Sequence, residues 1–211
     1  MKLVFATGNK GKLREASEIL GPEFELLSAA EAGVVEDVEE TGLTLKENSI
    51  IKAEFIYSKT GMDCFADDTG LEVDALGGAP GVRTARYAGE GCVFEDNIRK
   101  LLAELAKLDP ATPRTARFRS IVTLIIGGEK HFFEGVMEGS IALKKSGHEG
   151  FGYDPVFIPD LSADDISEYF NGVSPAPNTT VAEMTEEIKN EISHRGKALR
   201  AMAAWLKKSA G

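Results

Sequence analysis

The segment Lys2–Lys12, KLVFATGNKGK, runs from a short apolar stretch through a glycine-containing turn into a predicted helix. Lys2–Ala6 is expected to form a buried strand, and the pattern that follows predicts a helix over about residues 12–20. A second strand is expected at Phe24–Leu27. A chain that opens with strand, turn, helix and strand is typical of an α/β domain.

The clearest β signal lies further along the chain, where two long runs flank Gly127-Gly128. Thr115–Ile126 and Lys130–Glu138 are predicted to form a hairpin around this turn. Thr44 and Glu47 have the spacing of a capping box, so we expect a helix from there to about residue 59. The remaining expected elements are a strand at 63–66 that runs into a turn at 67–70, a strand at 71–76, helices at 94–108, 185–192 and 195–208, and an irregular surface insertion at 161–180.

These elements predict an α/β fold with one mixed sheet, helices around it and a hairpin-bearing second lobe. We find no internal repeat and no linker, so the interpretation is a single domain over residues 1–211 with two lobes. No apolar stretch approaches the ~20 residues that span a bilayer, and no membrane segment is expected. The first apolar run is too short for a signal peptide, which favours a cytoplasmic protein.

The formal net charge of −10 argues against sequence-independent binding to nucleic acid, which requires a basic surface. It does not argue against a small anionic ligand, because local lysines or a divalent cation can neutralise one within a cleft. If the ligand is a nucleotide, the acidity makes a metal more probable. The two cysteines, Cys64 and Cys92, fit no metal or disulfide pattern.

The turn Thr7-Gly8-Asn9-Lys10-Gly11-Lys12 is a candidate phosphate site. Its glycines allow close approach of the backbone, and free N–H groups at a helix start attract phosphate. The spacing is not that of a Walker A loop, which needs four residues between the glycines and a hydroxyl residue after the lysine. A plain strand-to-helix turn with a solvated lysine is the alternative.

The adjacent carboxylates of Asp67 and Asp68 are a candidate metal site. They repel each other beside a buried strand, and a hard cation such as Mg²⁺ would relieve the repulsion. An acidic turn is the alternative. Upstream, Glu40 is a further candidate ligand, while Asn48 and Lys52 share a helix face from which the lysine could reach a phosphate. Taken alone, that segment equally fits a solvated acidic loop and an amphipathic helix.

Two further stretches are candidates for contact with a base. In Phe151-Gly152-Tyr153-Asp154, glycines flank the phenylalanine and free it to stack on a planar ring, and the alternative is a core phenylalanine in a loop. His194 and Arg195, with Lys189 before them, could donate to a purine carbonyl, although such a pair is usually a surface feature.

Together these stretches resemble one family, the inosine/xanthosine triphosphate pyrophosphatases, from about Lys2 to Leu206. The motifs that carry the resemblance occur in the order of the family: Thr7-Gly8-Asn9-Lys10-Gly11-Lys12, Glu40-Thr41-Gly42, Glu47-Asn48, Ala66-Asp67-Asp68-Thr69-Gly70-Leu71, Gly77-Gly78-Ala79-Pro80-Gly81, Ala85-Arg86-Tyr87, Gly150-Phe151-Gly152-Tyr153-Asp154-Pro155 and Ser193-His194-Arg195-Gly196.

The resemblance implies an elongated mixed α/β fold with the active site in a cleft between two lobes, a homodimer and a requirement for Mg²⁺. It implies hydrolysis of the triphosphates of non-standard purines (ITP, dITP and XTP) to the monophosphate and pyrophosphate. A purine carbonyl at the 6-position would be selected by donors from His194 and Arg195, which adenine would leave unpaired.

The resemblance also assigns site residues by motif position. Asp68 would be the catalytic carboxylate, with Asp67 and Lys52 beside it, and Glu40, Asp67 and Asp68 would hold the metal. Residues expected to bind substrate are Thr7, Gly8, Asn9, Lys10, Gly11, Lys12, Asn48, Thr69, Phe151, Gly152, Tyr153, Asp154, Lys189, His194 and Arg195.

Three departures from the family pattern are visible. Thr69 replaces the usual serine and keeps the hydroxyl, and Gly147-His148-Glu149-Gly150 replaces a glycine- and threonine-rich lead-in. The stretch from Leu161 to Thr180 is longer than usual. Two other hypotheses stay open: a hydrolase of modified pyrimidine or mixed nucleotides, and an inactive nucleotide sensor. The sensor is disfavoured because it need not keep the carboxylates and lysines together.

Overall fold

The computed structural model describes residues 1–209, whose strands form a seven-stranded sheet in the order β2-β1-β3-β5-β6-β7, with β4 paired to β3. The chain divides into two compact units, and neither is a continuous stretch. The first unit comprises residues 1–69, 120–136 and 194 onward, and the second comprises 70–119 and 137–193.

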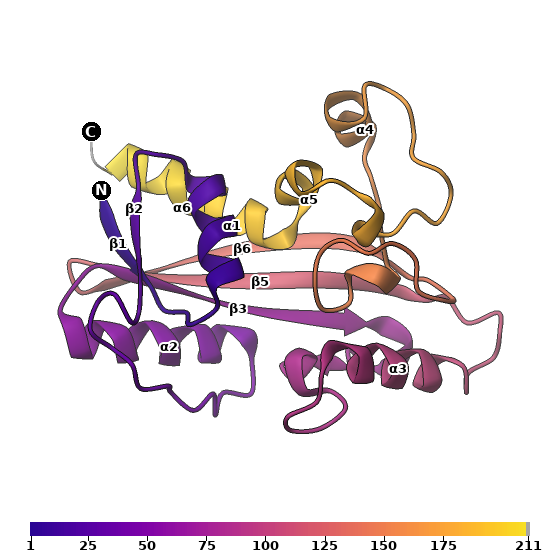
Figure 1. Ribbon diagram of the computed structural model, residues 1–211, viewed down its shortest axis with the longest axis horizontal. Helices are drawn as coiled ribbons and strands as arrows, with labels where there is room; N and C mark the ends of the chain where they lie inside the picture. Colours follow the sequence, from indigo (N-terminus) through magenta and orange to yellow (C-terminus); the bar gives the residue numbers. More distant parts are fainter. Residues whose placement is uncertain (210–211) are drawn as a thin grey trace. The chain divides into compact units, whose positions relative to one another are not determined.

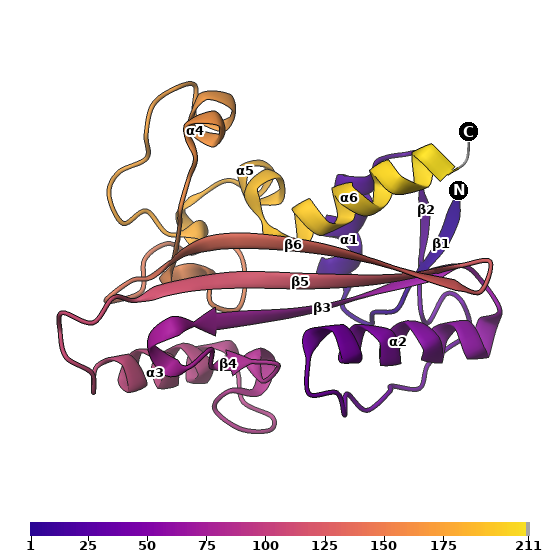
Figure 2. The same ribbon diagram turned by 180° about the vertical axis from the view of Figure 1, so that it is seen from behind.

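The first unit has a layer of helices on each face of its strands. Strand β1 (Lys2–Phe5) lies parallel to both β2 (Glu25–Ser28) and β3 (Cys64–Val73). Helix α2 (Leu45–Thr60) covers one face, while α1 (Lys10–Leu20) and α6 (His194–Ser209) cover the other (Figure 1). Figure 2 shows the same layers from behind.

Side-chain alternation along the strands builds these two interfaces. Leu3 and Phe5 are buried in a cluster with apolar residues of α1 and α6, whereas Val4 between them belongs to a cluster with residues of α2. Successive side chains of a strand point to opposite faces, so a strand covered on both sides is apolar throughout. This explains why Leu3–Phe5 is an unbroken apolar run.

Helix boundaries in the first unit follow the expected local signals. The capping box of α2 is present, with the Thr44 hydroxyl accepting from Glu47 N and the Glu47 carboxylate accepting from Thr44 N. The helix ends at Gly61, which has φ of 64° in the left-handed region. Helix α1 begins at Lys10, earlier than the sequence predicted, because Asn9 caps it.

The second unit surrounds a core of its own. The core unites apolar residues of α3 (Phe94–Leu105) and α5 (Glu186–Ile192) with residues from β3, β5 (Thr115–Ile126) and β6 (Glu129–Ile141). The other strands and helix of this unit are β4 (Pro80–Gly81), β7 (Phe157–Pro159) and α4 (Ala163–Tyr169). The predicted pair of long strands is confirmed, with positive φ at both turn glycines, Gly127 and Gly128.

The sequence-based prediction was wrong in three segments. Asp67–Gly70 is not a turn between two strands, because β3 runs without interruption from Cys64 to Val73. The segment 161–180 is not wholly irregular, since Ser162 and Asp165 form a capping box that starts α4. Helix α3 ends at Leu105, and the residues from there to Pro110 form turns.

Among residues 1–209, no helix is both long and apolar enough to cross a membrane.

Gly135 on β6 marks the closest approach of a helix to the sheet in the first unit. A methyl group at this position would overlap the His194 carbonyl oxygen and lie 2.6 Å from Ala198 N at the start of α6.

We therefore expect Gly135→Ala to lower the free energy of unfolding by at least about 1–3 kcal/mol, because the backbone of α6 must move to admit the methyl group. Chemical denaturation of the full chain measures this loss. Gly8→Ala is the matched control, since nothing lies within 4 Å of a methyl group there and no loss is expected. Equal stability of the two variants would contradict the close approach.

Candidate active site

Asp67 and Asp68 are consecutive residues of β3, and their side chains meet different helices. Asp67 contacts Lys12 of α1 and Arg195 of α6, whereas Asp68 contacts Lys52 of α2. Because consecutive side chains of a strand alternate between faces, the two carboxylates lie on opposite faces of the sheet. The expected turn is therefore absent, although Asp67 still repels Asp68 and contributes to its raised pKa.

The Asp67 carboxylate is almost fully buried in an ionic cluster, where it pairs with two cations. Its Oδ1 is 3.0 Å from Lys12 Nζ, and its Oδ2 accepts from Arg195 Nε at 2.9 Å. Arg195 is 2% exposed and also pairs with the carboxylate of Glu15 on α1. Burial alone would raise the pKa of Asp67, but Lys12, Arg195 and Lys52 outweigh burial and hold this pKa well below its usual range. These cations therefore favour the ionised form of Asp67.

The same cluster shifts the pKa of its two cations in opposite directions. Burial lowers the pKa of Lys12, with Arg195 and Lys52 adding repulsion against the attraction of Asp67. Arg195 also loses solvation, but the attraction of Asp67 and Glu15 raises its pKa. The guanidinium of Arg195 pairs with the carboxylates of Asp67 and Glu15, and the expectation that Arg195 contacts the base stays a prediction.

A second cluster lies where α2 meets β3. Lys52 Nζ is 2.7 Å from Asp68 Oδ1 and 3.0 Å from Glu40 Oε1, so the two carboxylates share one ammonium group. Burial raises the pKa of Asp68, as do Glu40 and Asp67, and these effects outweigh the attraction of Lys52. Burial would lower the pKa of Lys52, but Asp68 and Asp67 raise it.

Glu40 and Asp68 fit a divalent cation of the kind that uses few protein ligands. Their oxygens converge on a single positive charge, and hard cations such as Mg²⁺ are held by one or two carboxylates together with substrate phosphates. Within residues 1–209, no group of three or more His, Cys, Asp or Glu side chains forms a complete metal site. The expected third ligand, Asp67, instead pairs with Lys12 and Arg195.

The predicted phosphate turn is held by its own side chains. Asn9 Oδ1 accepts from Gly11 N at 2.8 Å and from Lys12 N at 3.2 Å, while Thr7 Oγ1 accepts from Asn9 N at 3.1 Å. Two of the helix-start N–H groups that were expected to face a phosphate are thus capped by Asn9. Gly8 has open space around it and keeps the close backbone approach that the sequence predicted.

Thr69 and Asn48 complete the polar residues predicted for the first unit. Thr69 Oγ1 lies 3.2 Å from Ser120 Oγ on β5. Asn48 is fully buried, and its Oδ1 accepts from Gly42 N at 2.8 Å. Asn48 and Lys52 both lie on α2, four residues apart as expected, and the amide of Asn48 is buried against Gly42.

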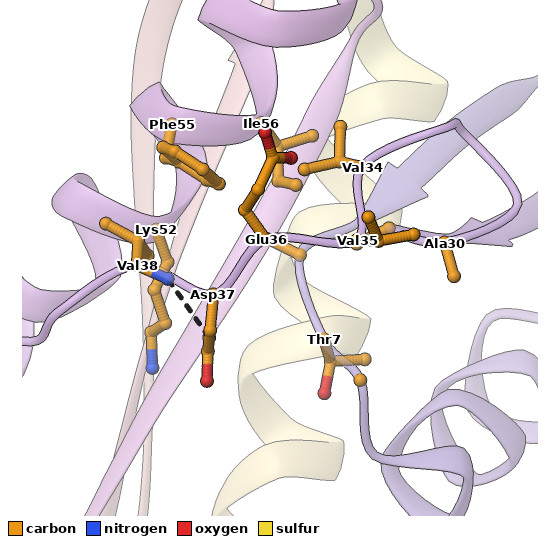
Figure 3. Close-up of a pocket in the computed structure, with 13 residues that line it drawn as sticks. Thr7, Ala30, Val34, Val35, Glu36, Asp37, Val38, Lys52, Phe55 and Ile56 are labelled. Atoms are coloured by element: carbon orange, nitrogen blue, oxygen red, sulfur yellow. Dashed lines mark hydrogen bonds between the residues drawn. The ribbon is translucent and has the colours of Figure 1, made fainter.

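A pocket of about 330 Å³ adjoins this part of the first unit (Figure 3). Apolar side chains from α2 and from the segment 29–38 form much of its wall, including Val34, Phe55 and Ile56. The polar ends of Thr7, Asp37 and Lys52 point to the same side of the pocket in Figure 3, whereas the Glu36 carboxylate points the opposite way. The sequence reasoning gave no role to these residues other than Thr7 and Lys52.

In the second unit, the loop 150–154 presents an aromatic ring above a charged pair. Phe151 is 43% exposed, and Lys189 Nζ lies 4.2 Å from its ring centroid. Asp154 Oδ2 accepts from Lys189 Nζ at 2.6 Å and from Phe151 N at 2.9 Å. Asp154 and Lys189 thus hold the loop that carries the ring. The motifs predicted that these three residues, Phe151, Asp154 and Lys189, lie together.

Tyr153 occupies a different environment from its neighbours in the motif. It is 2% exposed, and its hydroxyl donates to the Thr84 carbonyl oxygen within the core of the second unit. The Tyr153 side chain therefore packs within this core, and the prediction that Tyr153 binds substrate stays a prediction. Gly152 adopts φ of 65°, a conformation that favours glycine and allows the reversal between the exposed ring and the buried one.

Sequence reasoning missed two residues of the first unit's clusters, Glu15 and Ser120. Glu15 is a buried carboxylate on the helix face that otherwise carries Ala16 and Leu20. Charged residues are almost never buried without a partner, so a glutamate at a core-facing position signals a cation nearby. The sequence alone could not tell that this cation is Arg195, about 180 residues away.

Comparison with known proteins agrees with the resemblance that the motifs indicated. The dITP/XTP pyrophosphatase of Christiangramia forsetii is 46% identical over 208 residues, covering 99% of this chain and all of that protein. The dITP/XTP pyrophosphatase of Bacillus subtilis is 42% identical over 205 residues, 96% of each chain. A HAM1 protein from Coxiella burnetii has a solved structure that matches with a TM-score of 0.83 at 36% identity, covering 99% of each chain.

The family model points the same way, because it spans nearly the whole sequence. The model of the Ham1 family matches residues 3–205, and this chain belongs to the Ham1 family.

Proposed function

We propose that this protein hydrolyses the triphosphates of non-standard purines, ITP, dITP and XTP, to the monophosphate and pyrophosphate. The observation that carries the proposal is that Glu40 and Asp68 share the ammonium group of Lys52. Asp67, the residue before Asp68 on β3, pairs with a second lysine, Lys12. The names of the full-length relatives, dITP/XTP pyrophosphatases, support the choice of substrate.

Charge neutralisation dominates the proposed chemistry, because attack at the α-phosphorus releases the highly charged pyrophosphate. Lys12 and Lys52 supply positive charge to the phosphate oxygens, and the open backbone at Gly8 lets a phosphate approach the turn. A net charge of −10 makes these local cations necessary, and it disfavours nucleic acid as a partner.

Glu40 and Asp68 would hold Mg²⁺, which supplies charge neutralisation and makes a bound water more acidic when present. Asp68 is also suited to accept a proton, because burial raises the pKa of its carboxyl toward neutrality. Asp67 has a different role: its ionised carboxylate holds Lys12 in place on the opposite face.

The exposed ring of Phe151 is proposed to stack on the purine, with Lys189 and His194 as donors for the carbonyl at the 6-position. Base–aromatic stacking contributes about 1–3 kcal/mol. An adenine would leave such donors unpaired, at a cost of about 1–3 kcal/mol each. The family resemblance also leads us to propose a homodimer.

Product analysis tests the reaction. We expect ITP with Mg²⁺ to give inosine monophosphate and pyrophosphate, and to react much faster than ATP or GTP. Ion-exchange chromatography of the nucleotides, with a separate assay for pyrophosphate, identifies the products. Formation of inosine diphosphate and inorganic phosphate would show cleavage of the wrong bond, and tight ITP binding without turnover would favour a nucleotide sensor.

Asp68→Asn should lower kcat by about 10²- to 10⁴-fold, the range that general acid–base catalysis contributes, while the protein stays folded. Asp74→Asn is the matched control: Asp74 follows β3 and pairs with Arg117 at the surface, so its variant should turn over ITP at close to the wild-type rate. Circular dichroism checks folding. Wild-type turnover by Asp68→Asn would remove this residue from the mechanism.

Removal of divalent cations should abolish turnover without unfolding the protein, because Lys52 itself pairs with both Glu40 and Asp68. Thermal unfolding in a chelator, beside the same measurement in Mg²⁺, checks the second half of this expectation. Turnover that persists after exhaustive chelation would contradict the metal requirement, and unfolding in chelator would point to a structural cation.

A further inference from the structure

Asn48 lies in the first turns of α2, and the two ends of its amide have unequal surroundings. The residue is fully buried, and Oδ1 accepts from Gly42 N at 2.8 Å. Nδ2 is also buried, yet no described residue offers it an acceptor. Because Gly42 N is a donor, the atom that faces it must be the oxygen, so the amide cannot turn round to satisfy Nδ2.

The contact with Gly42 is tight enough to act as a latch. A methyl group at Gly42 would lie 2.6 Å from Asn48 Oδ1, 2.7 Å from Glu47 Cβ and 2.9 Å from Asn48 N. The following residues are held as well, since Glu47 Oε2 accepts from Leu43 N at 2.7 Å and from Thr44 N at 3.0 Å. The segment 42–44 is thus tied to the beginning of α2.

This latch determines where Glu40 lies. Glu40 is two residues before Gly42, and its carboxylate reaches Lys52, which is one helical turn after Asn48 on α2. The latch and the contact of Glu40 therefore belong to the same helix. Release of Gly42 from Asn48 would free the loop that carries Glu40 from the helix that carries Lys52.

We propose that Asn48 is a positioning residue with a second use: its Oδ1 sets Glu40 through Gly42, and its Nδ2 donates to an oxygen of the bound triphosphate. A buried donor without an acceptor lowers stability, and a ligand that brings the oxygen recovers that hydrogen bond. This inference rests on the proposed function, since it assigns both ends of Asn48 to a metal-bound polyphosphate.

Two kinds of variant separate the two ends of the amide. Gly42→Ala and Asn48→Leu break the latch, and we expect each to weaken the binding of Mn²⁺ by about 10- to 100-fold, as loss of an outer partner of a metal ligand does. Asn48→Asp keeps an oxygen for Gly42 N but replaces the donor. It should bind Mn²⁺ at least as tightly as the wild type and bind pyrophosphate with Mn²⁺ about 10- to 100-fold more weakly.

The measurements are electron paramagnetic resonance for Mn²⁺, calorimetry for pyrophosphate and denaturation for stability. Ser49→Ala is the matched control, because Ser49 is the next residue, is equally buried and bonds Thr123 on β5 at 2.7 Å. It should lose stability and keep both affinities.

If Gly42→Ala and Asn48→Leu bind Mn²⁺ as tightly as Ser49→Ala does, the positioning role is overturned. If one of the two variants does not fold, the Mn²⁺ affinity of the other decides. Wild-type pyrophosphate affinity in Asn48→Asp would overturn the donor role. Neither measurement uses a nucleotide, so failure of this inference is distinct from failure to cleave ITP.

Discussion

The candidate site depends on the alternation of side chains along a buried strand. Asp67 and Asp68 are adjacent in β3, and the strand sends one carboxylate to each face. A buried carboxylate without a partner is costly, so each face must supply a cation. Lys12 and Arg195 meet the first carboxylate and Lys52 meets the second. The placement of α1, α6 and α2 against β3 is therefore electrostatic as well as apolar.

Much of the fold could be predicted because its signals are local. The apolar run at Leu3–Phe5, the capping box at Thr44 and the glycine pair between β5 and β6 each determine a structure within a few residues. The prediction of a turn at Asp67 was wrong because it relied on the general rarity of aspartate in strands. In β3, Lys12 stabilises Asp67 and Lys52 stabilises Asp68. Those lysines are distant in sequence, and no window around Asp67 contains them.

For the predicted site residues, the structure adds contacts that the motifs did not indicate. Motif residues assigned together to substrate turned out to include a helix cap, Asn9, a core side chain, Tyr153, and a buried guanidinium, Arg195. Sequence motifs record that a residue is required, but they do not separate contact with a ligand from support of a neighbour. Burial and hydrogen-bond partners show which neighbours Asn48 and Arg195 support.

The division of two aspartates between faces also limits how β3 can change. Insertion or deletion of a single residue before Asp67 would exchange the two carboxylates between faces, so that each would meet the helices of the other. A change of two residues would restore the faces but would move both carboxylates along the strand, away from Lys12 and Lys52. The length of β3 before Asp67 is therefore restricted by the ion pairs on its two faces as well as by its apolar packing.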